Sequence, residues 1–259
     1  MNDTLNSNPR RRLKARHVIA AAVAVSVAAI AAVYLLFFTD DSPPPLTLST
    51  PSSTTPATAT PTTAPTTGAG RSAVAGLAGE WAIGTNSTAG YRVREKLARL
   101  PAQSDAVGRT SAITGAITVA STVAEGNQIT IANGARFEVD VTKLESDESM
   151  RDNRIRTMGL ESNRFPTATF VSAAPIELPA SAASGQAVKA EVTGDLTIHG
   201  ETRRVTIPLD AQLTGGRIEV VGSHRFPFSD FGMTPPNIGG FVTVDSNATL
   251  EFQLFFDKR

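Results

Sequence analysis

The sequence predicts an all-β domain that follows a non-globular N-terminal region, and three observations support this fold class. After residue 70, apolar and polar residues alternate with a period of two through most of the chain. Turn-forming residues separate these runs, and one segment has a helical pattern instead. The first 70 residues hold a long uncharged apolar stretch and a stretch rich in Pro, Thr and Ser. We therefore expect four consecutive parts, at residues 1–17, 18–38, 39–70 and 71–259.

Residues 1–17 form a basic tail, and residues 18–38 form an apolar segment without charge. Arg and Lys account for five of the first 16 residues. As a helix with a rise of about 1.5 Å per residue, the apolar segment would span roughly 31 Å, enough for a bilayer core. The preceding positive charge favours a cytoplasmic N-terminus, so we expect a single-pass protein of the cell membrane with an extracytoplasmic C-terminal domain. This transmembrane helix or signal anchor has a cleaved signal peptide as its alternative.

Residues 39–70 have the composition of a disordered linker. Between residues 43 and 70, 20 of the 28 residues are Pro, Thr or Ser. Such a stretch cannot bury apolar surface and favours extended conformations. At about 3.1 Å per residue, it would hold the following domain up to roughly 85 Å from the membrane.

The strands are expected in residues 71–259. In residues 188–198, for example, Val192, Gly194 and Leu196 alternate with Thr193 and Asp195. This alternation is typical of half-buried antiparallel strands. Residues 198–201 read IHGE and predict a tight hairpin turn between two strands. We expect strands at residues 81–83, 91–97, 113–119, 129–141, 169–178, 188–198, 203–213, 217–226 and 242–256.

Residues 149–163 differ from this pattern and predict one short helix. Met150, Ile155, Met158 and Leu160 could form a narrow apolar stripe on it. The helix should end before Pro166, because the residue before a proline is biased away from helical geometry. Residues 180–185 have the composition of a loop. About eight long strands with one helix suggest a closed antiparallel barrel or a sandwich, and periodicity alone does not choose between them.

Several function classes lack support in the sequence. The chain contains no cysteine, which excludes thiolate metal ligands and cysteine nucleophiles. Its formal net charge is zero, without the clustered basic face expected of a nucleic-acid-binding domain. We find no nucleophile elbow, phosphate-binding loop or zinc-protease motif. We therefore expect no catalytic residue, metal or cofactor.

The titratable candidates for chemistry have simpler structural explanations. His199 lies in the expected turn, and nothing places it near His224 to form a metal site. Asp152 heads the expected helix, where a carboxylate can cap backbone N–H groups. Asp230 lies among aromatic residues and can hydrogen-bond within its own loop.

Residues 192–205, which read VTGDLTIHGETRRV, resemble the signature hairpin of the YceI-like family. Further resemblances follow in the same order at residues 144–147 (LESD), 151–152 (RD), 164–170 (RFPTATF) and 229–232 (SDFG). The resemblance covers residues 77–257, and the anchor and linker are similar to those of members from high-GC Gram-positive bacteria. Many members carry a histidine two residues after the Arg-Asp pair, where this chain has Arg154.

The resemblance implies an extended eight-stranded antiparallel barrel, lipocalin-like, with one short helix. It also implies an apolar lumen that holds an isoprenoid-type lipid, such as a polyprenyl or quinone chain. We therefore expect extracytoplasmic lipid binding or carriage. The alternatives are an enzyme acting on a lipid-like substrate, with Arg151, Asp152 or His199 as participants, and a cell-surface interaction domain with a filled core.

The residues expected to face the lumen are the apolar members of the alternating runs and an aromatic cluster. The cluster contains Phe226, Phe228 and Phe231 with Met233, and it could either close one end of the barrel or form an apolar mouth. The candidate ligand-binding residues are Val93, Phe137, Val139, Leu196, Ile198, Val205, Ile207, Ile218, Val220, Phe226, Phe228, Phe231, Leu250, Phe252 and Leu254.

Overall fold

The computed structural model describes residues 42–50, 76–97, 103–124, 128–238 and 242–259. The expected basic tail and apolar segment, residues 1–38, lie outside these described residues. In the part of the chain that is described, no helix is long and apolar enough to cross a membrane.

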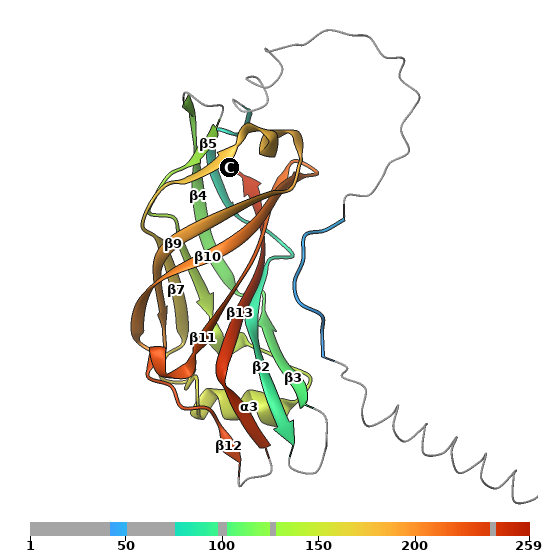
Figure 1. Ribbon diagram of the computed structural model, residues 1–259, viewed down its shortest axis with the longest axis vertical. Coiled ribbons are helices and arrows are strands. Elements are labelled where there is room, and N and C mark those ends of the chain that lie inside the picture. Colours follow the sequence, from blue (N-terminus) through green and yellow to red (C-terminus); the bar gives the residue numbers. More distant parts are fainter. Residues whose placement is uncertain (1–41, 51–75, 98–102, 125–127, 239–241) are drawn as a thin grey trace, which may run out of the picture. The chain divides into compact units, whose positions relative to one another are not determined.

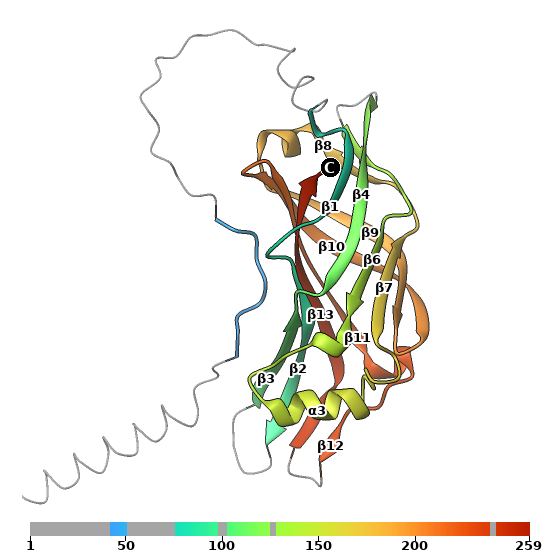
Figure 2. The same cartoon turned by 180° about the vertical axis from the view of Figure 1, so that it is seen from behind.

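The described strands form one antiparallel sheet in the order β3-β2-β13-β11-β10-β9-β7-β6-β4-β5-β8. Strand β1 pairs with both β13 and β4, so the sheet closes into an eight-stranded barrel with one helix (Figures 1 and 2). The eight strands of the closed ring are β1, β13, β11, β10, β9, β7, β6 and β4. This confirms the predicted barrel over the sandwich. The strands are β1 (Gly79–Ile83), β2 (Thr88–Leu97), β3 (Gln103–Thr110), β4 (Ile113–Ala124), β5 (Gln128–Ile131), β6 (Arg136–Asp140), β7 (Thr167–Ser172), β8 (Ile176–Pro179), β9 (Val188–Ile198), β10 (Glu201–Thr214), β11 (Arg217–Pro227), β12 (Asn237–Ile238) and β13 (Val242–Lys258).

Strand β9 shows how the alternating sequence produces the barrel wall. Its Val192, Gly194, Leu196 and Ile198 are buried, and the residues between them are partly exposed. The strand matches its predicted bounds and continues into β10 through the expected tight turn. His199 and Gly200 at the centre of that turn have φ angles of 54° and 78°. Two positive φ angles define the type I′ turn, whose twist suits a two-residue hairpin.

Two predicted strands are each broken in two. The run at residues 129–141 splits into β5 and β6 around Asn133 and Gly134, where Gly134 has a φ of 79°. The run at residues 169–178 splits into β7 and β8, and Pro175, which cannot donate to a ladder, lies in the gap. Strand β3 was not predicted because Ala106 and Val107 are its sole apolar residues.

The predicted helix is present as α3 (Ser149–Thr157), but it is shorter than expected. The chain turns sharply after it, since Gly159 and Glu161 have φ angles of 67° and 48°. None of its residues is buried, so the apolar stripe does not pack into a core. Short 3₁₀ helices occur at η1 (Val141–Lys143), η2 (Ala180–Ser184) and η3 (Phe228–Phe231). The second of these occupies the expected loop at residues 180–185.

Residues 42–50 belong to the expected linker, and the structure places them along the outside of the barrel. They are the blue segment in Figure 1, and they hydrogen-bond to β2, β3, β10, β11 and β13. The other linker residues, 39–41 and 51–70, lie outside the described part of the chain.

Candidate ligand-binding cavity

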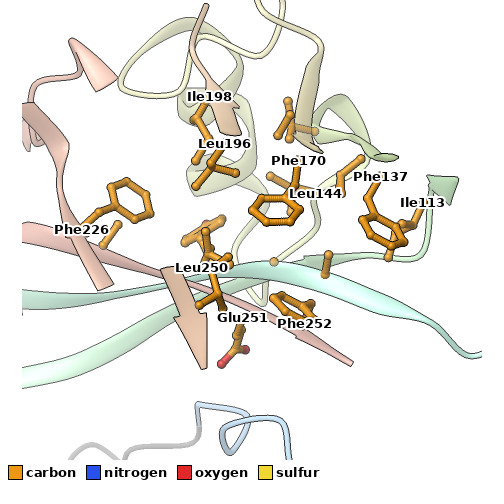
Figure 3. Close-up of a pocket in the computed structure, with 18 of the residues that line it drawn as sticks. Ile113, Phe137, Leu144, Phe170, Leu196, Ile198, Phe226, Leu250, Glu251 and Phe252 are labelled. Atoms are coloured by element: carbon orange, nitrogen blue, oxygen red, sulfur yellow. The ribbon is translucent and has the colours of Figure 1, made fainter. Parts of the chain in front are cut away.

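The barrel lumen encloses a cavity of about 700 Å³. Its wall is built mainly from aliphatic and aromatic side chains, which strands on all sides of the barrel contribute. Figure 3 shows Leu196, Phe170, Phe137 and Leu250 pointing into this shared space. Small-molecule sites in proteins typically have volumes of roughly 300–1,000 Å³ and a mostly apolar lining. The lumen is therefore a hollow of ligand size and not a filled core.

Thirteen of the fifteen residues expected to face the lumen line this cavity, and Val205 and Phe231 do not. Val205 lies near the β9–β10 turn, where it is half-buried against the aromatic cluster. Phe231 is 1% exposed and packs edge-to-face against Phe226 at 5.0 Å, behind the wall. The thirteen are Val93, Phe137, Val139, Leu196, Ile198, Ile207, Ile218, Val220, Phe226, Phe228, Leu250, Phe252 and Leu254.

The aromatic cluster forms part of the cavity wall and does not form an exposed apolar opening. Phe226, Phe228, Phe231 and Met233 are all buried. Three of them, Phe226, Phe228 and Met233, also line the cavity. The cluster therefore closes its side of the lumen while presenting an apolar surface to the interior.

The cavity opens beside α3. Met150 and Met158 line it and are 64% and 58% exposed, and they are the exposed large apolar side chains of the described residues. Ile155 and Leu160 line the same region. The stripe predicted for the helix thus faces the opening. Figure 2 shows α3 crossing one end of the barrel.

Polar side chains gather at this opening. Arg151 of α3 forms ion pairs with Asp147 and with Glu95 of β2, the latter at 3.3 Å between Nη2 and Oε2. Burial alone would lower the pKa of Arg151, but the charges and hydrogen bonds of Glu95 and Asp147 raise it. The guanidinium therefore stays charged and cannot act as a base. Arg154 also lines the opening.

One polar atom in the lining has no partner. The Tyr91 hydroxyl is buried and makes no hydrogen bond within the described structure. Its ring lies against Gly108 of β3, where a Cβ atom would come within 2.4 Å of the ring. Burial raises the pKa of Tyr91, so the phenol stays protonated at neutral pH.

Asp152 and His199, considered as enzyme residues, hold the structure around the opening and do not line the cavity. Asp152 does not cap the helix as predicted. Its Oδ1 instead accepts from Ser146 N at 3.0 Å and Ser146 Oγ at 2.6 Å, which fixes the loop before α3. His199 is within hydrogen-bonding distance of the Phe231 carbonyl at 3.2 Å and of Glu161 at 3.3 Å. Its ring packs on Phe165 at 4.3 Å.

The remaining titratable candidates do not form a site. Asp230 is exposed in η3, and His224 is half-buried on β11 beside Phe226. Burial lowers the pKa of His224. In the described part of the chain, no group of three or more His, Asp and Glu side chains could hold a metal ion.

Some lining residues were not predicted. Ile113 and Ile117 on β4, Phe170 on β7 and Val192 on β9 follow the same period-two alternation that identified the others. That signal could have found them. The α3 residues gave no such signal, because only the tertiary structure brings the helix to the end of the barrel.

Comparisons with known proteins agree with this architecture. Residues 81–256 match the family model described as the YceI-like domain. A UPF0312 protein of Vibrio parahaemolyticus is 32% identical over 122 residues, which is 44% of this chain and 59% of the relative. A UPF0312 protein of Vibrio cholerae is 28% identical over 123 residues, 44% of this chain and 60% of the relative. The matched stretches thus span about three fifths of these relatives.

A solved structure shows a similar fold. It is a polyisoprenoid-binding domain from Saccharophagus degradans implicated in plant cell wall breakdown. The likeness covers 70% of this chain and 99% of that chain, with a TM-score of 0.52 and 15% sequence identity.

Proposed function

The chain belongs to the YceI-like domain family, and on that premise we propose that its barrel binds and carries an apolar, isoprenoid-type lipid. The observation that carries this proposal is the apolar lumen of about 700 Å³. The polyisoprenoid-binding domain of similar fold supports the choice of ligand class. A polyprenyl or quinone chain would suit such a lumen.

Hydrophobic burial would supply most of the binding free energy. Removing an apolar group from water stabilises it by about 0.8 kcal/mol per methylene, or roughly 4 kcal/mol for each five-carbon isoprene unit. Ordering the chain offsets part of this gain. Because aromatic and branched side chains line the lumen on all sides, several isoprene units can be buried there, and their contributions add.

The ligand's polar group would lie at the α3 opening. The charged groups there are Glu95, Asp147, Glu148, Arg151 and Arg154, and the rest of the lumen is nearly all apolar. A lipid with its chain inside and its head beside α3 would keep its own polar group out of the apolar interior. The hydrogen bonds that Asp152 and His199 make within the protein support a binding role over a catalytic one.

The location of the domain is a further part of the proposal. The basic tail and the uncharged residues 18–38 support a single-pass membrane anchor with the barrel on the extracytoplasmic side. A lipid carrier tethered in this way would work next to the membrane that supplies or receives its ligand.

The test is to identify what the protein binds. The chain from residue 42 to 259, which the contacts define as one unit, would be purified without detergent and extracted with organic solvent. We expect mass spectrometry to find near-stoichiometric isoprenoid lipid. An extract without such lipid, from a protein that also takes up no added polyprenol or quinone, would reject the proposal.

A further inference from the structure

Residues 42–50 cross five neighbouring strands on the outer face of the barrel. The carbonyl oxygens of Pro43 and Pro44 each accept a hydrogen bond of 2.6 Å, from Arg92 of β2 and Arg109 of β3 respectively. The Thr47 carbonyl accepts from a side chain of β13 at 3.1 Å. Ser49 bonds to β10 and β11. These five strands are consecutive in the sheet, so the segment lies across it as a strap.

The barrel has a built site for this strap at Glu219. Its neighbours in β11, Ile218 and Val220, line the lumen, so Glu219 points outward, yet it is 0% exposed. Its carboxylate accepts from Ser49 N at 2.8 Å and Ser49 Oγ at 3.0 Å. It also accepts from Gln212 at 2.6 Å and Gln253 at 2.7 Å. A buried carboxylate is costly without such partners, and the strap supplies two of them.

A second contact site lies under the prolines. Glu251 is 4% exposed and pairs with Arg109 at 2.7 Å and with Arg92 at 3.3 Å. Figure 3 shows its carboxylate pointing out of the cavity, toward the blue segment. With Glu251 held on one side, each guanidinium has a further N–H group that donates to a proline carbonyl.

The strap sequence suits this surface. Three consecutive prolines, residues 43–45, restrict the unbound segment to extended conformations and so reduce the entropy lost on docking. Beyond them, Leu46 and Leu48 are half-buried while Thr47 between them is exposed. The segment therefore has a face toward the barrel and a face toward solvent, which a free linker would not need.

We propose that residues 42–50 are a strap that holds the mouth of the barrel close to the membrane. This inference rests on the anchor at residues 18–38 in the proposed function. Without docking, the 37 residues from 39 to 75 would form the tether and could extend roughly 115 Å at about 3.1 Å per residue. With the strap docked, residues 39–41 alone separate anchor and barrel, a reach of about 10 Å.

The strap also selects which end of the barrel faces the anchor. Pro43 is held by Arg92, which is three residues along β2 from Glu95 at the α3 opening. At about 3.3 Å per residue, this distance is about 10 Å. The other end of the strap binds Glu219, close to the β10–β11 turn. The described N-terminal end of the strap therefore lies near the opening, where lipid would enter and leave.

The docking can be tested by hydrogen exchange on the full-length chain in detergent micelles. We expect the Ser49 amide to exchange roughly tenfold or more slowly than in an unstructured peptide, because it donates to Glu219. Glu219→Ala should abolish this protection. Asp210→Ala removes an exposed carboxylate from β10 and should not. An unprotected Ser49 amide in the unmodified chain would overturn the proposal.

The orientation can be tested in lipid vesicles. Because the chain has no cysteine, Asn153→Cys on α3 gives a single site for a donor fluorophore, with acceptors placed in the bilayer. Ser49→Pro removes the strap's N–H and hydroxyl without altering the barrel, and it should reduce energy transfer about twofold or more. Equal transfer in both proteins would overturn the strap's role. Release of the protein from the membrane by carbonate would reject the anchor, and absence of bound lipid would reject the carrier function. In either case, hydrogen exchange at the Ser49 amide still shows whether the strap is docked.

Discussion

Leu196, Ile207 and Phe252 point into the lumen from three different strands, so single substitutions there alter the cavity without altering the outer wall. Leu196 and Ile207 are 6% and 3% exposed, as core residues would be. What distinguishes them from core residues is the empty volume in front of them. This difference can be measured, because a filled core and a hollow respond oppositely to a larger side chain.

Leu196→Trp should reduce lipid occupancy severalfold and change the unfolding free energy by less than about 1 kcal/mol. The same substitution in a packed core would cost about 1–3 kcal/mol. Ile207→Trp should behave similarly, and Phe252→Ala should keep the lipid. Thr197→Trp, on the outer face of the same strand, is the control and should leave occupancy unchanged. Chemical denaturation and lipid quantification provide the two measurements, and a large stability loss with unchanged lipid would contradict a hollow lumen.

Tyr91→Phe should leave the lipid-free domain equally stable or more stable, by up to about 1 kcal/mol. The substitution keeps the ring and removes a buried hydroxyl that has no hydrogen-bond partner. Ser87→Ala is the matched control, since the Ser87 hydroxyl donates to the Gly84 carbonyl at 2.9 Å and accepts from Phe255 N at 3.0 Å. Its removal should cost about 1–3 kcal/mol. Urea denaturation measures both, and a clear loss in Tyr91→Phe would show that the hydroxyl has a partner.

At the level of elements, the β9–β10 hairpin depends on glycine for two separate reasons. Gly200 has a φ of 78°, and a Cβ atom there would lie 2.8 Å from the Phe165 ring. Gly134, in the β5–β6 turn, has nearly the same φ of 79° but no atom within 4 Å of such a Cβ. Comparing substitutions at Gly134 and Gly200 therefore separates the cost of backbone strain from the cost of a steric conflict.

Gly134→Ala should cost about 1 kcal/mol from the left-handed backbone alone. Gly200→Ala should cost about 1–3 kcal/mol more, because the added methyl group displaces Phe165 and with it the ring contact of His199. Thermal unfolding of both variants checks the difference. Equal losses would show that Phe165 moves away freely.

Local sequence predicted the elements that depend on local interactions. The β9–β10 hairpin follows from alternation and from a His-Gly turn, and β11 and β13 follow from alternation alone. Strand β3 was missed because its stability comes from pairing with β2 and from the bridge between Arg109 and Glu145, which no local pattern reports. The breaks at Gly134 and Pro175 were visible as turn residues, but the apolar residues around them outweighed that signal.

The lining of the cavity was likewise predictable only where the local sequence carries a signal. Inward-facing residues such as Leu196 and Phe252 were predictable, since period-two alternation places them on one face. The alternating pattern does not show whether that face encloses a cavity or a filled core. That distinction requires the structure of the closed sheet. The opening beside Met150 and Met158 could not be predicted, because a helix with no buried residue has no sequence signal for its position.

At the scale of the whole molecule, the first test concerns the anchor. If residues 18–38 are retained in the bilayer, the full-length protein should stay in the membrane fraction through high-salt and carbonate washes. A chain beginning at residue 42 should be released into the soluble fraction and serves as the control. A mature N-terminus between residues 30 and 45, with the protein free in the medium, would instead support a cleaved signal peptide.

The strap makes the whole molecule sensitive to acid through Glu219. Burial on its own would raise the pKa of this carboxyl, but hydrogen bonds from Gln212, Gln253 and Ser49 outweigh it and lower the pKa below the ordinary value of 4.5. A lowered pKa in the docked state means that docking is fully stabilised above that ordinary value. The stabilisation is lost as the pH falls through the lowered pKa, because the protonated carboxyl accepts these bonds poorly.

The expected result is reversible release of the strap in acid. In vesicles carrying the α3 fluorophore, energy transfer to the bilayer should be constant from pH 7 down to the ordinary carboxyl value of 4.5 and should fall as the pH drops further. Glu219→Gln keeps the shape of the side chain but cannot titrate, so its transfer should not depend on pH over this range. Circular dichroism at each pH confirms that the barrel stays folded. An unchanged signal in the unmodified protein at every pH at which the barrel stays folded, or an identical fall in Glu219→Gln, would show that Glu219 does not control the strap.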